Sequence, residues 1–104
     1  MDQKILDTLK RYKQTLLKED GFEIVAVFGS FARDDVSNNS DIDILYNINN
    51  KFLKKYGGFQ AFYKINKIRE KLQKELNREI DLATIDNSSD TFKKFALKDV
   101  IYVQ

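Results

Sequence analysis

The sequence contains no cysteine, histidine, proline or tryptophan among its 104 residues. Without cysteine, disulfide bonds and thiolate catalysis are excluded. Because histidine is missing as well, the usual zinc ligands are absent, and any bound metal must be held by oxygen atoms. Oxygen ligands favour hard cations such as magnesium, manganese or calcium. The commonest general base is also missing, so proton transfer must use a carboxylate or water.

A strong charge of one sign and long apolar runs are also missing. The 18 basic and 16 acidic residues are intermixed and give a net charge of +2, unlike the basic footprint of a dedicated nucleic-acid binder. No apolar stretch reaches the length of a membrane span, and the charged N-terminal segment does not resemble a signal peptide. We therefore expect a cytoplasmic protein that binds neither membrane nor nucleic acid. The length fits a single domain over residues 1–104.

Hydrophobic periodicity predicts helices alternating with short strands. Apolar residues at helical spacing predict a first helix over Ile5–Leu17 that ends at Gly21, and a longer amphipathic helix that ends near Leu76. The core face of the longer helix is built on Phe62, Ile65, Ile68, Leu72 and Leu76. The expected strands are Phe22–Phe28, Asp41–Tyr46 and Glu79–Ile85, with a short helix near Phe92–Leu97 and an apolar tail, Val100–Val103, that is either an edge strand or part of the core. This order predicts an α/β (α+β) fold with a small mixed sheet of three or four strands packed with helices.

Two carboxylates alternate with apolar residues at the start of the second expected strand. Asp41 and Asp43 occupy positions i and i+2, so they point to one face, about 6.5–7 Å apart, while Ile42 faces the core. That separation allows both carboxylates to reach a shared divalent ion and leaves room for a second ion. A solvent-facing strand carries such pairs by chance as well, so Asp41 and Asp43 need further support.

That support comes from the junction after the first expected strand. Gly29 allows the backbone to approach a ligand closely, and the N–H groups at the start of a helix near Ser30 bind anionic phosphate. Arg33 follows one turn later, placed to meet a phosphate oxygen. Taken alone, Gly29-Ser30 would be an ordinary turn with a capping serine.

A third carboxylate interrupts an otherwise apolar strand. Asp81 lies between Ile80 and Leu82, and it completes a three-carboxylate cluster if its strand lies beside the one that carries Asp41 and Asp43. Like charges that converge in this way usually hold a cation. Asp86 is the alternative third ligand, although its place before Asn87-Ser88-Ser89 is more typical of a turn cap.

These motifs together resemble the nucleotidyltransferase superfamily that includes DNA polymerase β. Gly29-Ser30-Phe31-Ala32-Arg33 followed by Ser40-Asp41-Ile42-Asp43 is similar to the minimal nucleotidyltransferases of prokaryotes, among them the antitoxins of HEPN–nucleotidyltransferase toxin–antitoxin pairs. The chain departs from these relatives at Asp34, where glycine is frequent. A negative charge there would not help to bind a triphosphate, so the role of Arg33 stays open.

The resemblance implies the chemistry of two magnesium ions, for which manganese could substitute. Asp41 and Asp43 would contact both ions, Gly29 and Ser30 would hold the triphosphate, and Asp81 would hold the ion that activates an acceptor hydroxyl for attack on the α-phosphate. By resemblance, the nucleotide is ATP and the acceptor is a hydroxyl of a HEPN-type helical partner protein. Two alternatives remain: a small-molecule, aminoglycoside-like nucleotidyltransferase, and an antitoxin that acts by contact without catalysis.

Two further features have no assigned role. Four lysines form a basic stripe on the long helix, which is most simply a solvated surface and otherwise a docking strip for an acidic partner or RNA: Lys64, Lys67, Lys71 and Lys74. Three aromatic residues around Gly57-Gly58 belong either to the edge of the core or to a lip over the nucleotide: Phe52, Tyr56 and Phe59.

Overall fold

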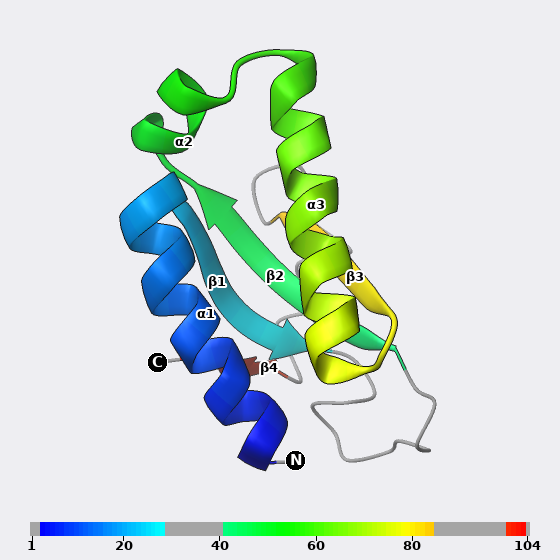
Figure 1. Ribbon diagram of the computed structural model, residues 1–104. Coiled ribbons are helices and arrows are strands. Elements are labelled where there is room, and N and C mark those ends of the chain that lie inside the picture. The colour runs from blue at the N-terminus through cyan, green and yellow to red at the C-terminus, as the bar shows by residue number, and fades with distance from the viewer. Residues whose placement is uncertain (1–2, 29–40, 85–99, 104) are drawn as a thin grey trace.

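The computed structural model describes residues 3–28, 41–84 and 100–103. Along these ranges the elements are α1 (Gln3–Asp20), β1 (Phe22–Phe28), β2 (Ile42–Ile48), α2 (Asn50–Lys55), α3 (Phe59–Leu76), β3 (Ile80–Thr84) and β4 (Val100–Tyr102). Figure 1 shows α1 and α3 covering one face of a twisted sheet, with α2 at one end of that layer. Neither long helix is apolar enough to cross a membrane, and the same holds for every helix in the described part of the chain.

The sheet has four strands in the order β3-β2-β1-β4. β1 pairs antiparallel with both β2 and β4, whereas β2 and β3 run parallel. A parallel pair needs a crossover connection, and α2 and α3 supply it between β2 and β3 (Figure 1). The predicted mixed sheet of helix-covered strands is therefore confirmed, and the tail Val100–Tyr102 is an edge strand.

The hydrophobic core lies between the sheet and the two long helices. Ile42 and Ile44 alternate along β2 toward the helices and are fully buried, together with Leu9 of α1 and Leu72 of α3. Burying each such side chain contributes about 1.5–3 kcal/mol relative to exposure. Because the alternation along β2 is strict at its start, Asp43 is left on the opposite face of the sheet.

Gly21 joins α1 to β1 through a close backbone approach. Its φ of +72° lies in the left-handed region, and its N–H donates to the carbonyl of Leu17 at 3.1 Å, which caps the helix. Its own carbonyl accepts from the N–H of Asn49 at 3.1 Å. A Cβ at this position would lie 2.1 Å from Oδ1 of Asn49 and 2.7 Å from the backbone nitrogen of Phe52. The end of α1 and the start of α2 therefore meet at a position that only glycine fits.

Asp20, the last residue of α1, is buried and links three helical segments. Its carboxylate accepts from the hydroxyl of Tyr56 at 2.7 Å and from Nζ of Lys55 at 3.0 Å, and Nζ of Lys64 lies 3.5 Å away. Burial acts to raise the pKa of Asp20, but the hydrogen bonds from Tyr56 and Lys55 and the charges of Lys64 and Lys55 outweigh it, so the pKa is lowered. This network holds the end of α1 against α2 and α3.

Several predicted boundaries differ from the structure. Helix α2 was not predicted, although Asn49 caps it by accepting from the backbone N–H of Phe52. The prediction that Phe62 faces the core is wrong, because its side chain is 74% exposed. The buried stripe of α3 instead passes through Ile68 and Leu72. The predicted turn of helix from Ser30 and the short helix at Phe92–Leu97 lie outside the described residues.

Candidate active site

Asp43 of β2 and Asp81 of β3 lie side by side on the face of the sheet that points away from the helices. The parallel pairing places Asp43 opposite Asp81 in register, and neighbouring strands are about 4.8 Å apart. The two side chains are close enough to interact through a hydrogen bond. The sequence left open whether the strand of Asp81 would neighbour that of Asp43, and the structure pairs them directly.

The register of this pair is fixed by the turn between α3 and β3. Asn77 ends α3 in the left-handed conformation, with φ of 54°, and its N–H donates to the carbonyl of Gln73. The side-chain oxygen of Gln73 then accepts from the N–H of Ile80 at 3.1 Å, and the N–H of Ile42 donates to the carbonyl of Glu79 at 2.9 Å. These hydrogen bonds fix the starting point of β3 against β2. Asp81 therefore meets Asp43 and not one of its neighbours.

The electrostatics of Asp43 show that negative charge is crowded here. Burial, the charge of Asp81, the hydrogen bond with Asp81 and the charge of Asp41 together raise the pKa of Asp43 to about 6. A carboxyl group in such surroundings keeps its proton to a higher pH than an ordinary aspartate does, and a bound cation would favour its ionised form. The neighbouring carboxylates of Asp43 and Asp81 are a donor set that fits a hard divalent cation.

Asp41 lies at the flank of the pair. It precedes β2, is exposed to solvent, and contributes its charge to the environment of Asp43. Within residues 3–28, 41–84 and 100–103, no three carboxylate side chains are close enough to form a metal site by themselves. The structure thus brings Asp43 and Asp81 together, with Asp41 beside them but not joined into a compact triad.

The chain leaves β1 directly next to this pair. Phe28, the last residue of β1, is the cross-strand partner of Asp43. The predicted phosphate-binding residues follow Phe28 immediately in sequence, so the connection that carries them starts beside the carboxylates. Gly29, Ser30 and Arg33 lie outside the described residues, and so does Asp86, the alternative third ligand.

The Asp20 network was missed by the sequence interpretation. Asp20 directly precedes Gly21 and looks like an ordinary charged residue at a helix end, while Tyr56 is far away in sequence. No spacing rule links the two positions, because their contact depends on how α2 packs beside α1. The one available signal was Asn49, a good N-cap residue placed just before α2.

A groove of about 570 Å³ lies on the other side of the molecule, between α1 and α3. Its apolar wall includes Tyr12, Leu16 and Ile68, and most of its charged residues are basic. Because the two helices cover the sheet face opposite to Asp43 (Figure 1), this groove is separate from the carboxylate pair.

Comparison with known proteins identifies the family. The family model described as "Polymerase beta, Nucleotidyltransferase" matches residues 4–104. A protein of Methanocaldococcus jannaschii, MJ1379, named as a candidate protein adenylyltransferase, is 29% identical over 100 residues, covering 95% of this chain and 94% of its own. The protein adenylyltransferase MntA of Thermococcus cleftensis is 26% identical over 101 residues, covering 97% and 94% of the two chains.

Solved structures share the fold. A candidate minimal nucleotidyltransferase superposes with a TM-score of 0.67 at 22% identity, over 97% of this chain and 95% of its own. A toxin–antitoxin structure with AMP-PNP superposes with a TM-score of 0.64 at 18% identity, over 91% and 72% of the two chains. A third is the tri-AMPylated HEPN toxin of Shewanella oneidensis in complex with its MNT antitoxin, with a TM-score of 0.53 at 16% identity, over 95% and 71% of the chains.

The family model covers nearly the whole chain, from the first turn of α1 to the last residue, and the carboxylate pair lies within it. Nucleotidyl transfer is the activity of this family, and divalent metal ions generally support it. The chain belongs to the polymerase-β nucleotidyltransferase family.

Proposed function

We propose that this protein is a magnesium-dependent protein adenylyltransferase that moves AMP from ATP onto a hydroxyl of a HEPN-type partner protein, as an antitoxin. The observation that carries the proposal is the Asp43–Asp81 pair, whose crowded charge needs a cation, at the end of β1 in a chain of this family. The choice of AMP and of a protein acceptor follows the relatives that are named protein adenylyltransferases and match over nearly their full length. Because the reaction consumes ATP, we place it in the cytoplasm.

In the proposed reaction, the acceptor hydroxyl oxygen forms a bond to the α-phosphorus of ATP. The bond between the α-phosphorus and its bridging oxygen breaks, and pyrophosphate leaves with the electron pair. The hydroxyl proton passes to a neighbouring carboxylate or to water, since the chain has no histidine. Bound magnesium would neutralise the triphosphate and lower the pKa of the attacking hydroxyl.

The residues of the chain have separate parts in this proposal. Asp41, Asp43 and Asp81 hold the metal ions, and the backbone at Gly29 and Ser30 binds the triphosphate. Arg33 is the proposed contact to a phosphate oxygen. Positioning by these groups supplies most of the rate, because phosphoryl transfer needs little covalent participation by the protein.

Two arguments favour a protein acceptor over a small molecule. The chain matches two relatives over 94% of their length, one named a protein adenylyltransferase and the other a candidate for that activity. The solved structures of this fold include an AMPylated HEPN toxin bound to an antitoxin. Both observations support the HEPN-type partner as acceptor.

The proposal is tested by a transfer assay on candidate HEPN-type partner proteins, taken first from the genes that flank this one. The purified pair is incubated with α-labelled ATP and magnesium, and the intact mass of both proteins is measured. We expect AMP-sized additions on the partner with the wild-type chain and none with Asp43→Asn. The exposed Asp7, on α1, provides the matched control, and Asp7→Asn should transfer AMP as the wild type does. An unmodified partner with the wild-type chain would contradict the proposal.

The same assay decides the third ligand. Asp81→Asn should retain much of the affinity for a non-hydrolysable ATP analogue yet lose turnover by roughly two or more orders of magnitude, because an activated hydroxyl is needed only in the transition state. Asp86→Asn should keep its activity and lose at most about 1 kcal/mol of turn or cap stability. If Asp86→Asn is inactive while Asp81→Asn is active, Asp86 is the ligand.

A further inference from the structure

The first turn of α3 presents three aromatic side chains to solvent. Phe59 is 91% exposed, Phe62 is 74% exposed and Tyr63 is 66% exposed. Their spacing of i, i+3 and i+4 places them on one side of the helix, turned away from the side of Ile68 and Leu72 that packs on the sheet. We call Phe59, Phe62 and Tyr63 the aromatic face of α3.

The aromatic face is unusual for the outer side of a surface helix. That side normally carries polar residues, and contiguous exposed apolar surface in a folded protein marks a site of interaction. Aromatic residues are also enriched at the centres of protein interfaces, where a few large side chains supply most of the binding energy. Leu53 of α2, the helix that precedes α3, is 53% exposed as well.

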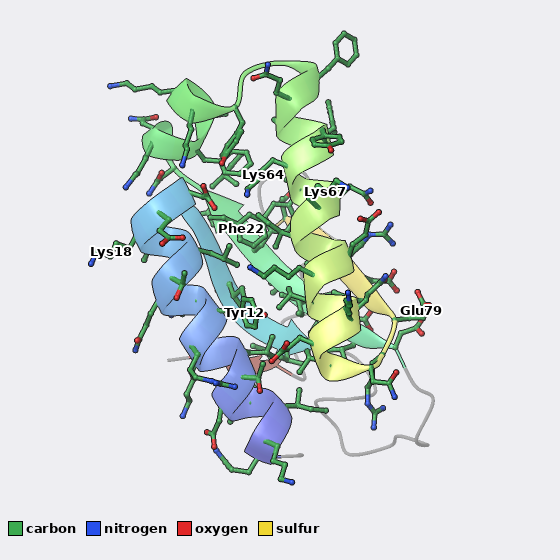
Figure 2. All side chains as sticks on the ribbon, viewed as in Figure 1. Tyr12, Lys18, Phe22, Lys64, Lys67 and Glu79 are labelled. Carbon is green, nitrogen blue, oxygen red and sulfur yellow. The ribbon has the colours of Figure 1, made fainter. Side chains whose placement is uncertain are left out.

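Positive charge borders the aromatic face. Nζ of Lys67 lies 5.3 Å from the centre of the Tyr63 ring and 3.8 Å from Glu70, an exposed ion pair that solvent screens. Nζ of Lys64 lies deeper, 5.4 Å from the centre of the Tyr56 ring and 3.5 Å from Asp20. Figure 2 shows Lys64 and Lys67 on α3 and Tyr12 on α1, on the helix side of the molecule. Both lysines line the groove between α1 and α3, and further along it Nζ of Lys71 lies 5.7 Å from the Tyr12 ring. The stripe of lysines on α3 thus runs from the aromatic face into the groove.

We propose that the aromatic face of α3 and the adjoining lysines dock a partner protein that presents apolar side chains ringed by carboxylates. A second copy of this chain fits poorly, because it would bring Lys64 and Lys67 against their own counterparts. A protein is favoured over a nucleic acid because the relatives that match over nearly their full length are named protein adenylyltransferases. An acidic protein surface satisfies both the apolar centre and the basic border.

This inference rests on the proposed function in one respect, that the docked protein is also the AMP acceptor. The aromatic face belongs to the helix layer, whereas Asp43 and Asp81 lie on the opposite face of the sheet. One short segment of the partner cannot therefore occupy both places. The partner docks through one element and presents its hydroxyl from another, so loss of docking should raise KM for the partner and leave kcat unchanged.

The test uses the full chain and the purified HEPN-type partner protein of the transfer assay. Affinity is measured by titration calorimetry and KM and kcat by AMP transfer for three variants: Phe59→Ser/Phe62→Ser, Lys67→Glu and Leu17→Ser. We expect the double variant to weaken Kd and raise KM by about tenfold or more, with kcat and ATP affinity unchanged. Lys67→Glu should weaken binding less, and by an amount that shrinks with added salt. Leu17, 37% exposed on α1, provides the control, and Leu17→Ser should bind as the wild type does.

The outcomes separate this inference from the proposed function. If the wild type modifies the partner while Phe59→Ser/Phe62→Ser binds as tightly as Leu17→Ser, the docking surface is wrong and the function stands. If the double variant weakens binding but the wild type transfers no AMP, the surface is supported and the function fails. Absence of binding by the wild type overturns the surface. The surface is also wrong if the wild type self-associates, or binds single-stranded RNA or anionic vesicles, and Phe59→Ser/Phe62→Ser abolishes that binding while binding to the partner persists.

Discussion

At the scale of single residues, Asp43 connects the charge of the site to the stability of the fold. Its partial burial opposes ionisation, and so do the negative charges of Asp81 and Asp41. The folded state raises its pKa from 3.8 to about 6, so the unfolded chain loses the proton first as pH rises. Stability should therefore fall between about pH 4 and pH 6 and remain lower above that range in the absence of metal.

Asp43→Asn should remove this penalty. We expect the metal-free variant to be more stable than the wild type at pH 8 by about 1 kcal/mol once solvent screening is allowed for, and equally stable near pH 3.5. Urea unfolding at the two pH values measures the difference. Added magnesium should stabilise the wild type and not the variant. A variant that is less stable than the wild type at pH 8 would show that charge crowding is not the dominant effect at Asp43.

At the scale of elements, the junction of α1, β1 and α2 depends on Gly21. Gly21→Ala places a methyl group against Asn49 and the backbone of Phe52 and also strains a backbone with φ of +72°. We expect a loss of about 2–4 kcal/mol in the free energy of unfolding, measured by urea denaturation. Gly57→Ala is the matched control, because the nearest atom to its Cβ, the carbonyl oxygen of Leu53, is 3.9 Å away. Its effect should stay within about 0.5 kcal/mol.

The Asp20 network gives a second prediction for the helix layer. The lowered pKa of Asp20 means that its ionised form stabilises the fold above its unfolded pKa, and that this stabilisation is lost as pH falls through the folded pKa. Asp20→Asn should cost about 1–3 kcal/mol at pH 7, because charged hydrogen bonds are replaced by neutral ones. The difference from the wild type should shrink below pH 4. Tyr56→Phe, which removes only the hydroxyl donor, should cost less; a difference for Asp20→Asn that does not change with pH would contradict this account.

The elements that were predictable from the sequence are those with local signals. β1 is a nearly continuous apolar run between Gly21 and Gly29, interrupted only by Glu23, and it was predicted with its observed bounds. α2 gave no usable periodicity, because only Phe52 of its six residues is buried. Phe62 fits a helical repeat with Ile65, yet the stripe that packs on the sheet follows Ile65, Ile68 and Leu72, which excludes Phe62. Local spacing cannot decide which of two overlapping stripes a sheet will cover.

At the scale of the whole molecule, the candidate site depends on strand order, which the sequence does not encode locally. Asp41 and Asp43 could be recognised from their spacing alone, whereas the adjacency of Asp43 and Asp81 required the parallel pairing of β2 with β3. The predicted adjacency was conditional on that pairing, and the structure supplies it. The roles of Gly29, Ser30, Arg33 and the three carboxylates in catalysis stay predictions.

Binding of ATP and magnesium should stabilise the whole fold by linkage. Each ligand neutralises charge that opposes the other, so together they should raise the melting temperature more than the sum of their separate effects. A ligand present at one hundred times its Kd contributes about 2.7 kcal/mol. Thermal scans with magnesium, with each nucleoside triphosphate and with both together measure this, with Asp43→Asn as the insensitive control. Equal melting temperatures in all scans of the wild type would contradict nucleotide binding.

The parallel pairing of β2 and β3 also determines when the site can form during synthesis. The chain must complete α2 and α3 before β3 exists, so a nascent protein that ends within α3 has Asp43 but no Asp81 beside it. Pairing of β3 with β2 is also slow relative to local contacts, because contacts distant in sequence must first overcome the entropy of closing the intervening loop. The proposed metal binding by Asp43 and Asp81 would therefore require a chain folded through β3, and shortened products that end before Ile80 would lack this part of the site.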